Sequence, residues 1–205
     1  MAVPRTLEEL NQHPVFSYFL WLCEIPHATF KEKALSNAIY TWAKRHEKWM
    51  SWQDTHHNLY IRKPATPGYE AKPALLFQAH LDMVCVAAPG VIHNFDKDPL
   101  TLALEGDRLT TGGRTTLGAD DGIGVALAMA LLDDETQAHP ESKFFSRQQK
   151  KRISAGPRQQ ILIGSMPTNS SISIMPGKTM PLREAPAATG STTKGPSYRK
   201  NLVRT

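Results

Sequence analysis

A histidine and an aspartate follow an apolar segment with a spacing that suits a metal site. The sequence Gln78-Ala79-His80-Leu81-Asp82 stands at the carboxyl end of the apolar segment 74–80. In an extended chain, side chains two residues apart point to the same side. A metal-binding imidazole needs its second ring nitrogen held by a partner such as a carboxylate. His80 is therefore a candidate metal ligand that Asp82 would orient, although ordinary hydrogen bonds at a strand end would give the same pattern.

A second acidic group lies 40 residues further on, where a strand would turn into a helix. Glycines on both sides of Ala119-Asp120-Asp121 permit a tight backbone. Carboxylates at a helix start gain from free backbone amides and from the helix dipole, so Asp121 is explained as a cap. A carboxylate can also bridge two divalent ions about 3.5–4 Å apart. Asp120 is the candidate for that role, and a capped, glycine-bounded turn is the simpler alternative.

The elements that must position these residues alternate between helices and strands. Apolar residues at helical spacing predict three helices, at 6–22 (broken near Pro14, with Thr6 and Glu9 as a capping box), at 30–45 and at 123–132. Apolar or alternating segments predict four strands, at 48–53, 58–63, 74–80 and 100–109. Helices that alternate with buried strands indicate an α/β layer fold.

Three segments carry a resemblance to a known family. PATPGYEAKPALLFQAHLDMV, HNFDKDPL and TTLGADDGIG together resemble the aminoacyl-histidine dipeptidases, also called cytosol non-specific dipeptidases, a branch of the two-zinc exopeptidases. The resemblance runs from about Leu10 to Pro140. It implies that residues 1–140 are a partial metallopeptidase catalytic domain, the truncated amino-terminal half of an α/β domain of the zinc-exopeptidase type.

The same resemblance implies roles for individual residues. His80 would bind one zinc, Asp82 would serve catalysis by orienting His80, and Asp120 would bridge two zinc ions, with manganese or cobalt as substitutes. Asp121 falls where the family varies and is given no metal role. The implied substrates are dipeptides, often with histidine as the carboxyl residue, and no substrate-binding residue is assigned.

The far half of the family's site is missing from the sequence. The family mechanism needs a Glu-Glu pair soon after the Ala-rich helix, one Glu as general base and one as ligand, followed by a further acidic ligand and a late His. After residue 140 there is no Glu-Glu pair, no Asp and no His. We therefore expect a truncated, inactive form of a metal-dependent dipeptidase that binds a single metal weakly.

The charge also changes at this point. The chain has a net charge of +5, but 12 of its 24 basic residues lie in 141–205, against only 2 of its 19 acidic residues. Residues 165–205 are rich in Ser, Thr, Pro, Gly and Lys, and only 161–163 and 172–174 look able to be buried. Such a composition predicts that 141–205 is a disordered basic tail.

A shift of reading frame would explain both changes. Permitted codons for Ser142–Arg152, read from the third base, give QVLFTTAEET, a buried strand ending in a Glu-Glu pair that overlaps residues 149–151. The same frame over Ser171–Met180 permits LNIDYAGEDN, which resembles the family's next strand and acidic ligand. Because the codons are freely chosen, only the coding DNA can decide. The hypothesis is a frameshift near residues 140–142.

Other classes of protein fit less well. The first residues contain no apolar run, so we expect no signal peptide and no membrane partner. Cys23 and Cys85 have no metal-ligand spacing and are expected to be reduced thiols in a cytoplasmic protein.

The main alternative function is binding of nucleic acid or an acidic partner by the basic tail. No known nucleic-acid motif supports it, so a nucleic-acid partner is not expected. A metal-dependent hydrolase with another substrate would share the His-x-Asp pattern but not PATPGYE or HNFDKDPL.

Overall fold

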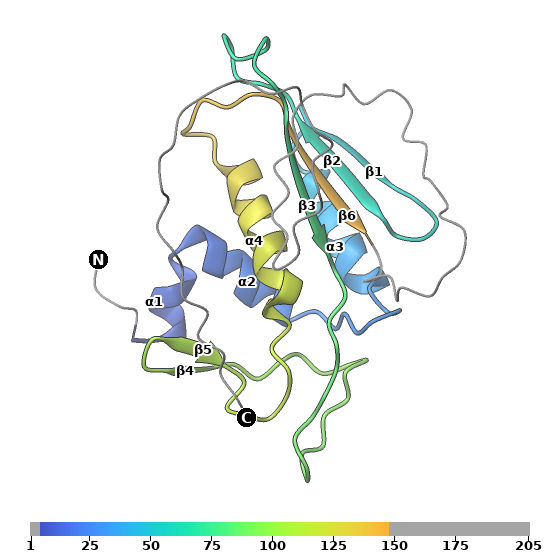
Figure 1. Cartoon of the computed structure of the whole chain (residues 1–205), viewed down its shortest axis with the longest axis vertical. Coiled ribbons are helices and arrows are strands. Elements are labelled where there is room, and N and C mark those ends of the chain that lie inside the picture. Colours follow the sequence, from blue (N-terminus) through green and yellow to red (C-terminus); the bar gives the residue numbers. More distant parts are fainter. Residues whose placement is uncertain (1–4, 148–205) are drawn as a thin grey trace, which may run out of the picture.

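The chain folds into a four-stranded mixed sheet with helices packed against it (Figure 1). The structure is a computed structural model that describes residues 5–147. The strand order is β1-β2-β6-β3, with β1 at Met50–Gln53, β2 at Leu59–Lys63, β6 at Ser142–Arg147 and β3 at Leu75–His80. β2 is antiparallel to both of its neighbours, whereas β3 and β6 run parallel. The sequence therefore predicted β1, β2 and β3 correctly to within about two residues.

Local sequence signals explain the starts of the first two helices, whereas the helices predicted at 30–45 and 123–132 begin three residues later and four residues earlier, respectively. α1 (Leu7–Asn11) is capped by the Thr6 side chain, which accepts a hydrogen bond from the Glu9 amide at 3.1 Å. Pro14 begins α2 (Pro14–Cys23), a position where its missing amide proton costs nothing, and this explains the predicted break. α3 spans Lys33–Ala43 and α4 spans Ala119–Asp133. No helix within residues 5–147 is long and apolar enough to cross a membrane.

The predicted strand at 100–109 is two strands. β4 (Ala103–Glu105) and β5 (Arg108–Thr110) form an antiparallel hairpin. Gly106 turns the chain between them with a φ of 64°, a left-handed conformation that glycine adopts without strain. The sequence predicted one half-exposed strand ending in a turn; the single strand was wrong, because alternation of apolar and polar residues does not show that the turn lies inside the segment and that a second strand follows it.

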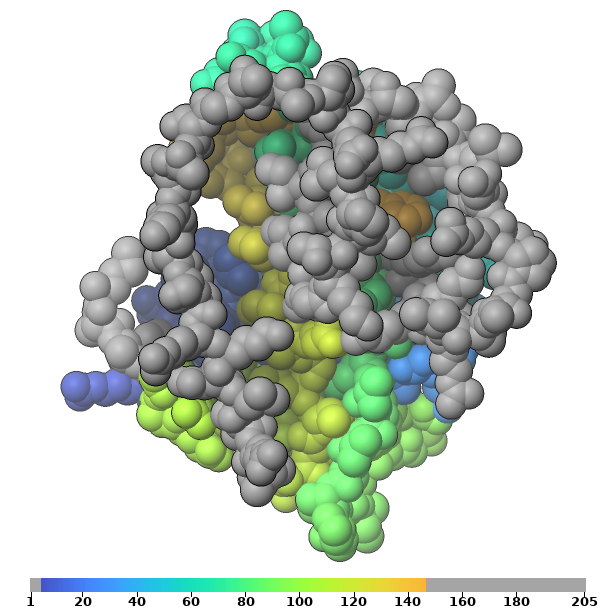
Figure 2. Space-filling view, viewed as in Figure 1, coloured from blue at the N-terminus to red at the C-terminus, as the bar shows by residue number. Residues whose placement is uncertain are grey.

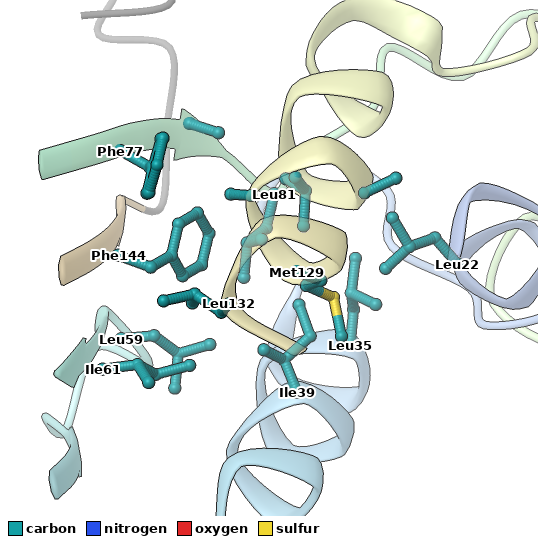
Figure 3. Packing of buried hydrophobic residues seen from close by; sticks show 14 of the residues in the cluster. Leu22, Leu35, Ile39, Leu59, Ile61, Phe77, Leu81, Met129, Leu132 and Phe144 are labelled. Carbon is teal, nitrogen blue, oxygen red and sulfur yellow. The ribbon is translucent and has the colours of Figure 1, made fainter. Parts of the chain in front are cut away.

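The core lies between one face of the sheet and helices α3 and α4 (Figure 3). Ile61, Phe144 and Phe77 are register partners on three adjacent strands, so their side chains share that face. Ile61 and Phe144 are completely buried, as is Leu132 of α4. β6 is therefore an interior strand that joins β2 to β3.

β6 corrects the prediction that the chain is disordered from residue 141. Residues 142–147 form a strand because both edges of β6 find backbone partners, one on β2 and one on β3. Those partners are distant in sequence, so no local pattern predicts the strand. The remainder of the predicted tail, including 149–151, 161–163 and 172–174, lies outside the described residues.

Two connections project from opposite ends of the sheet (Figure 2). The turn-rich segment 64–73 projects at one end, where β3 begins. The segment 84–92, which follows β3, projects at the other and carries exposed Val84, Val86 and Ile92. The carboxyl end of β3, where the candidate site lies, is thus bordered by an apolar loop.

Candidate metal centre

His80 is the last residue of β3, and both of its ring nitrogens face aspartates. Its Nδ1 lies 3.1 Å from Asp82 Oδ1 and 3.1 Å from the Asp82 carbonyl oxygen. Its Nε2 lies 3.3 Å from Asp120 Oδ1. The hydrogen bond to the Asp82 side chain is the main cause that raises the pKa of His80, and the charges of Asp82 and Asp121 act in the same direction against partial burial. The structure thus brings together the three residues that the sequence singled out.

Asp120 reaches His80 because the chain makes an irregular turn before α4 becomes a regular helix. Gly118 is left-handed, with φ 72° and ψ 20°, and Asp120 has φ −98° and ψ 100°. The peptide bond between Asp120 and Asp121 is cis. The Asp120 side chain remains 58% exposed, so its carboxylate faces the solvent side of the site as well as His80.

Asp121 points elsewhere. It is only 3% exposed, and its carboxylate lies over Gly124, where an added Cβ would sit 2.3 Å from Oδ1. Such a position at the start of α4 suits a group that interacts with free helix amides. The two adjacent aspartates therefore differ in environment, and the one at the site is Asp120.

Asp82 is buried and has a partner that the sequence analysis did not predict. The Thr29 hydroxyl donates to Asp82 Oδ2 at 2.8 Å. Thr29 lies 53 residues earlier, in the loop before α3. No motif connects the two positions, because the contact depends on how the loop packs beside the end of β3.

The residues of the site line a cleft of about 270 Å³ between the end of β3 and the start of α4. Its walls include His80, Asp82 and Asp120, together with Met83, Val84, Thr116, Leu117, Gly118 and Ala119. Two larger hollows lie beside α1 and α2, but none of the three candidate residues lines them. The three candidate residues therefore lie in the smaller cleft.

The facing atoms of His80 and Asp120 fit adjacent positions around a zinc ion. Tetrahedral ligands about 2.0–2.1 Å from zinc lie about 3.3 Å from one another. The separation of Nε2 and Oδ1 is 3.3 Å. Within residues 5–147, however, no group of three or more His, Cys, Asp and Glu could hold a metal. The described residues therefore bring together two candidate ligands, without a third beside them.

Gly118 provides a test of how this turn is built. Gly118→Ala should lower the free energy of unfolding by about 1–2 kcal/mol, because a left-handed alanine is strained. In addition, its Cβ would lie 2.6 Å from Met83 Sδ. Urea unfolding of the variant measures the loss.

Gly113→Ala is the matched control, since Gly113 has a φ of +69° but open space at its Cβ position. Gly113→Ala should introduce the same backbone strain without the steric clash, so it should lower the free energy of unfolding by less than Gly118→Ala does. Equal losses would contradict close packing of Met83 on the turn.

Comparison with known proteins shows which proteins share this fold. No model of a protein family matches the chain. Over 133 residues the chain is 41% identical to the cytosol non-specific dipeptidase of Escherichia coli (strain K12), which covers 65% of this chain and 27% of that protein. The crystal structure of aminoacylhistidine dipeptidase from Vibrio alginolyticus superposes with a TM-score of 0.66 and 33% identity. That match covers 72% of this chain and 30% of the other.

The described residues thus match part of a peptidase of known structure, with mixed helices and strands. More narrowly, the matched residues are related to the amino-terminal part of the aminoacyl-histidine dipeptidases, which confirms the family that the sequence motifs predicted. The chain spans less than a third of the length of either relative.

Proposed function

We propose that this chain derives from a metal-dependent dipeptidase and carries the part of its metal site that the amino-terminal half of the domain provides. His80 and Asp120 would be ligands and Asp82 would orient His80. The observation that carries the proposal is the pairing of His80 Nε2 with Asp120 Oδ1 at 3.3 Å while Nδ1 faces Asp82. Zinc is the expected metal, with manganese or cobalt as substitutes, and dipeptides are the expected substrate class.

Each of the three residues would have a separate role in the proposed site. Asp82 would accept the Nδ1 proton of His80, which would leave the Nε2 lone pair directed at Asp120 and the cleft. The partly exposed Asp120 carboxylate adds negative charge beside that lone pair. A divalent metal held there would polarise a scissile carbonyl and activate water. Removing a proton from that water calls for a general base, which none of these three residues is placed to be.

We further propose that the 205-residue chain does not catalyse the reaction. A Glu-Glu pair, Asp and His are all missing after residue 140, so the expected base and the remaining ligands are missing too. With two ligands, binding of one metal should be weak. A cytoplasmic location is inferred from the two free cysteines and from the name of the relative in Escherichia coli.

The composition of β6 supports the proposal that a frameshift replaced the original continuation. An interior strand with a parallel neighbour is usually rich in Val, Ile and Leu. β6 instead reads Ser-Lys-Phe-Phe-Ser-Arg and buries Ser142, Lys143 and Ser146. Within the described residues the Ser146 hydroxyl is buried without a hydrogen-bond partner. The alternative frame would place Val, Leu and Phe in this strand, and sequencing the coding DNA decides whether Glu codons overlap residues 149–151.

A hydrolysis assay tests the function. The purified chain and a version with the frame restored are incubated with zinc or manganese and a dipeptide ending in histidine. We expect turnover from the restored protein and none above the metal blank from the 205-residue chain. Turnover by the chain itself would refute its inactivity, and an inactive restored protein would count against the dipeptidase proposal. Salt-dependent nucleic-acid binding, measured beside it, tests the alternative that rests on the basic tail.

A further inference from the structure

The Asp82 carboxylate is held from two sides. It is only 5% exposed, so water cannot supply most of its hydrogen bonds. Oδ1 faces His80 Nδ1 at 3.1 Å, and Oδ2 accepts the Thr29 hydroxyl at 2.8 Å. Asp82 stands between the end of β3 and Met83, whose backbone is bridged to Ala28. Its side chain is held in part by these two partners.

Thr29 is itself held rigidly beside Asp82. The Thr29 amide donates to the Met83 carbonyl at 3.1 Å, and the Met83 amide donates to the His27 carbonyl at 3.1 Å. These two bonds form a short parallel bridge centred on Ala28 and Met83. His27 is buried, and its Nδ1 lies 2.6 Å from the Ile25 carbonyl. The loop thus locks the backbone of Thr29 to the residue that follows Asp82.

The side chain of Thr29 suits this position. A threonine has few χ1 rotamers because it is branched at Cβ, so a fixed backbone also fixes its hydroxyl. The hydroxyl lies 2.8 Å from Asp82 Oδ2 and 3.2 Å from the Met83 carbonyl, and its single proton favours the nearer, charged acceptor. Thr29 is not among the residues that line the cleft. Its hydroxyl therefore acts on His80 indirectly, through the Asp82 carboxylate and the neighbouring Met83 backbone.

We propose that Thr29 is a positioning residue for the candidate metal centre, which fixes the Asp82 carboxylate and through it the tautomer of His80. Asp120 Oδ1, 3.3 Å from Nε2, favours a proton on Nε2, whereas the Asp82 carbonyl and Oδ1, each 3.1 Å from Nδ1, favour a proton on Nδ1. With Oδ2 bound to Thr29, Oδ1 stays directed at Nδ1 and holds the proton of neutral His80 there. The Nε2 lone pair then points toward Asp120, where a cation would bind. This inference rests on the proposed metal site for its purpose, but the hydrogen-bond relay can be tested without a metal.

The first test reads the His80 ring directly. In the metal-free chain at alkaline pH, ¹⁵N NMR of the imidazole should show the Nδ1-protonated tautomer. Thr29→Val keeps the shape but removes the hydroxyl and should produce a mixture of tautomers, whereas Thr29→Ser should restore the original one. Thr41→Val removes a hydroxyl that bonds to the Asn37 carbonyl within α3 and should leave His80 unchanged. A general loss of stability would not by itself change the tautomer.

The second test measures Co²⁺ affinity by its absorption spectrum. Loss of a residue that supports a ligand typically costs 10–100-fold, so we expect Thr29→Val to weaken binding by about tenfold and Thr29→Ser to restore it. If Thr29→Val does not fold, Thr29→Ala serves instead. An unchanged tautomer and affinity in the folded variant would overturn the role of Thr29. If the unmodified chain binds no Co²⁺, the metal site fails, and the tautomer measurement still decides the relay.

Discussion

Replacing Asp120 with Asn should weaken Zn²⁺ binding by the 205-residue chain by about 100-fold or more. In the proposed site Asp120 would provide one of the two facing ligand atoms, and Asn keeps its size while removing its negative charge. Loss of a group that only supports a ligand already costs about 10–100-fold, so loss of a ligand should cost at least as much. Calorimetric titration with Zn²⁺, repeated with Co²⁺, measures the change.

The control must remove the same charge without touching the site. Asp107→Asn does so, because Asp107 is exposed in the turn between β4 and β5 and does not line the cleft. Its affinity should equal that of the unmodified chain. If Asp107→Asn and Asp120→Asn weaken binding equally, the metal is attracted by overall charge, and the proposed centre is wrong.

The sequence could single out the three candidate residues because both motifs that contain them are local. His80 and Asp82 need only an extended chain to face one another, and Asp120 needs only a glycine-bounded turn before a helix. That Asp120 meets His80 depends on the packing of α4 beside β3, and only the family resemblance predicted it. Thr29 was missed because a hydroxyl that bonds to a carboxylate 53 residues away leaves no pattern.

The same distinction between local and distant contacts explains which elements of the fold could be predicted from the sequence. The break at Pro14 and the cap at Thr6 are set by neighbouring residues, and both were predicted. β6 was not, because the segment Ser142–Arg147 has two polar ends and no clear alternation. It is a strand only because β2 and β3 leave a place between them. Strand formation depends on partners to this degree because β-propensity mainly reflects packing on neighbours.

The inserted strand leads to the largest expected effect on stability. Phe144→Ala should lower the free energy of unfolding by about 3–5 kcal/mol, the usual cost of removing a buried aromatic ring. Phe144 is completely buried between Ile61 and Phe77, and its ring faces Leu132 (Figure 3). Domains of this size are stable by only about 5–15 kcal/mol, so the variant should be close to unfolding. Urea denaturation followed by tryptophan fluorescence measures the loss.

Phe145→Ala separates this role from a general need for aromatic residues in the segment. Phe145 is the next residue of β6, so it points to the opposite face of the sheet, and it is only partly buried. Its loss should cost about 1 kcal/mol, the typical value for a substitution outside a packed core. Equal and small losses from both variants would mean that β6 does not insert between β2 and β3. If Phe145→Ala were the more damaging, the strand would be inserted with the opposite face toward α4. A large loss at Phe144 alone would establish that residues beyond 140 complete the sheet that carries His80.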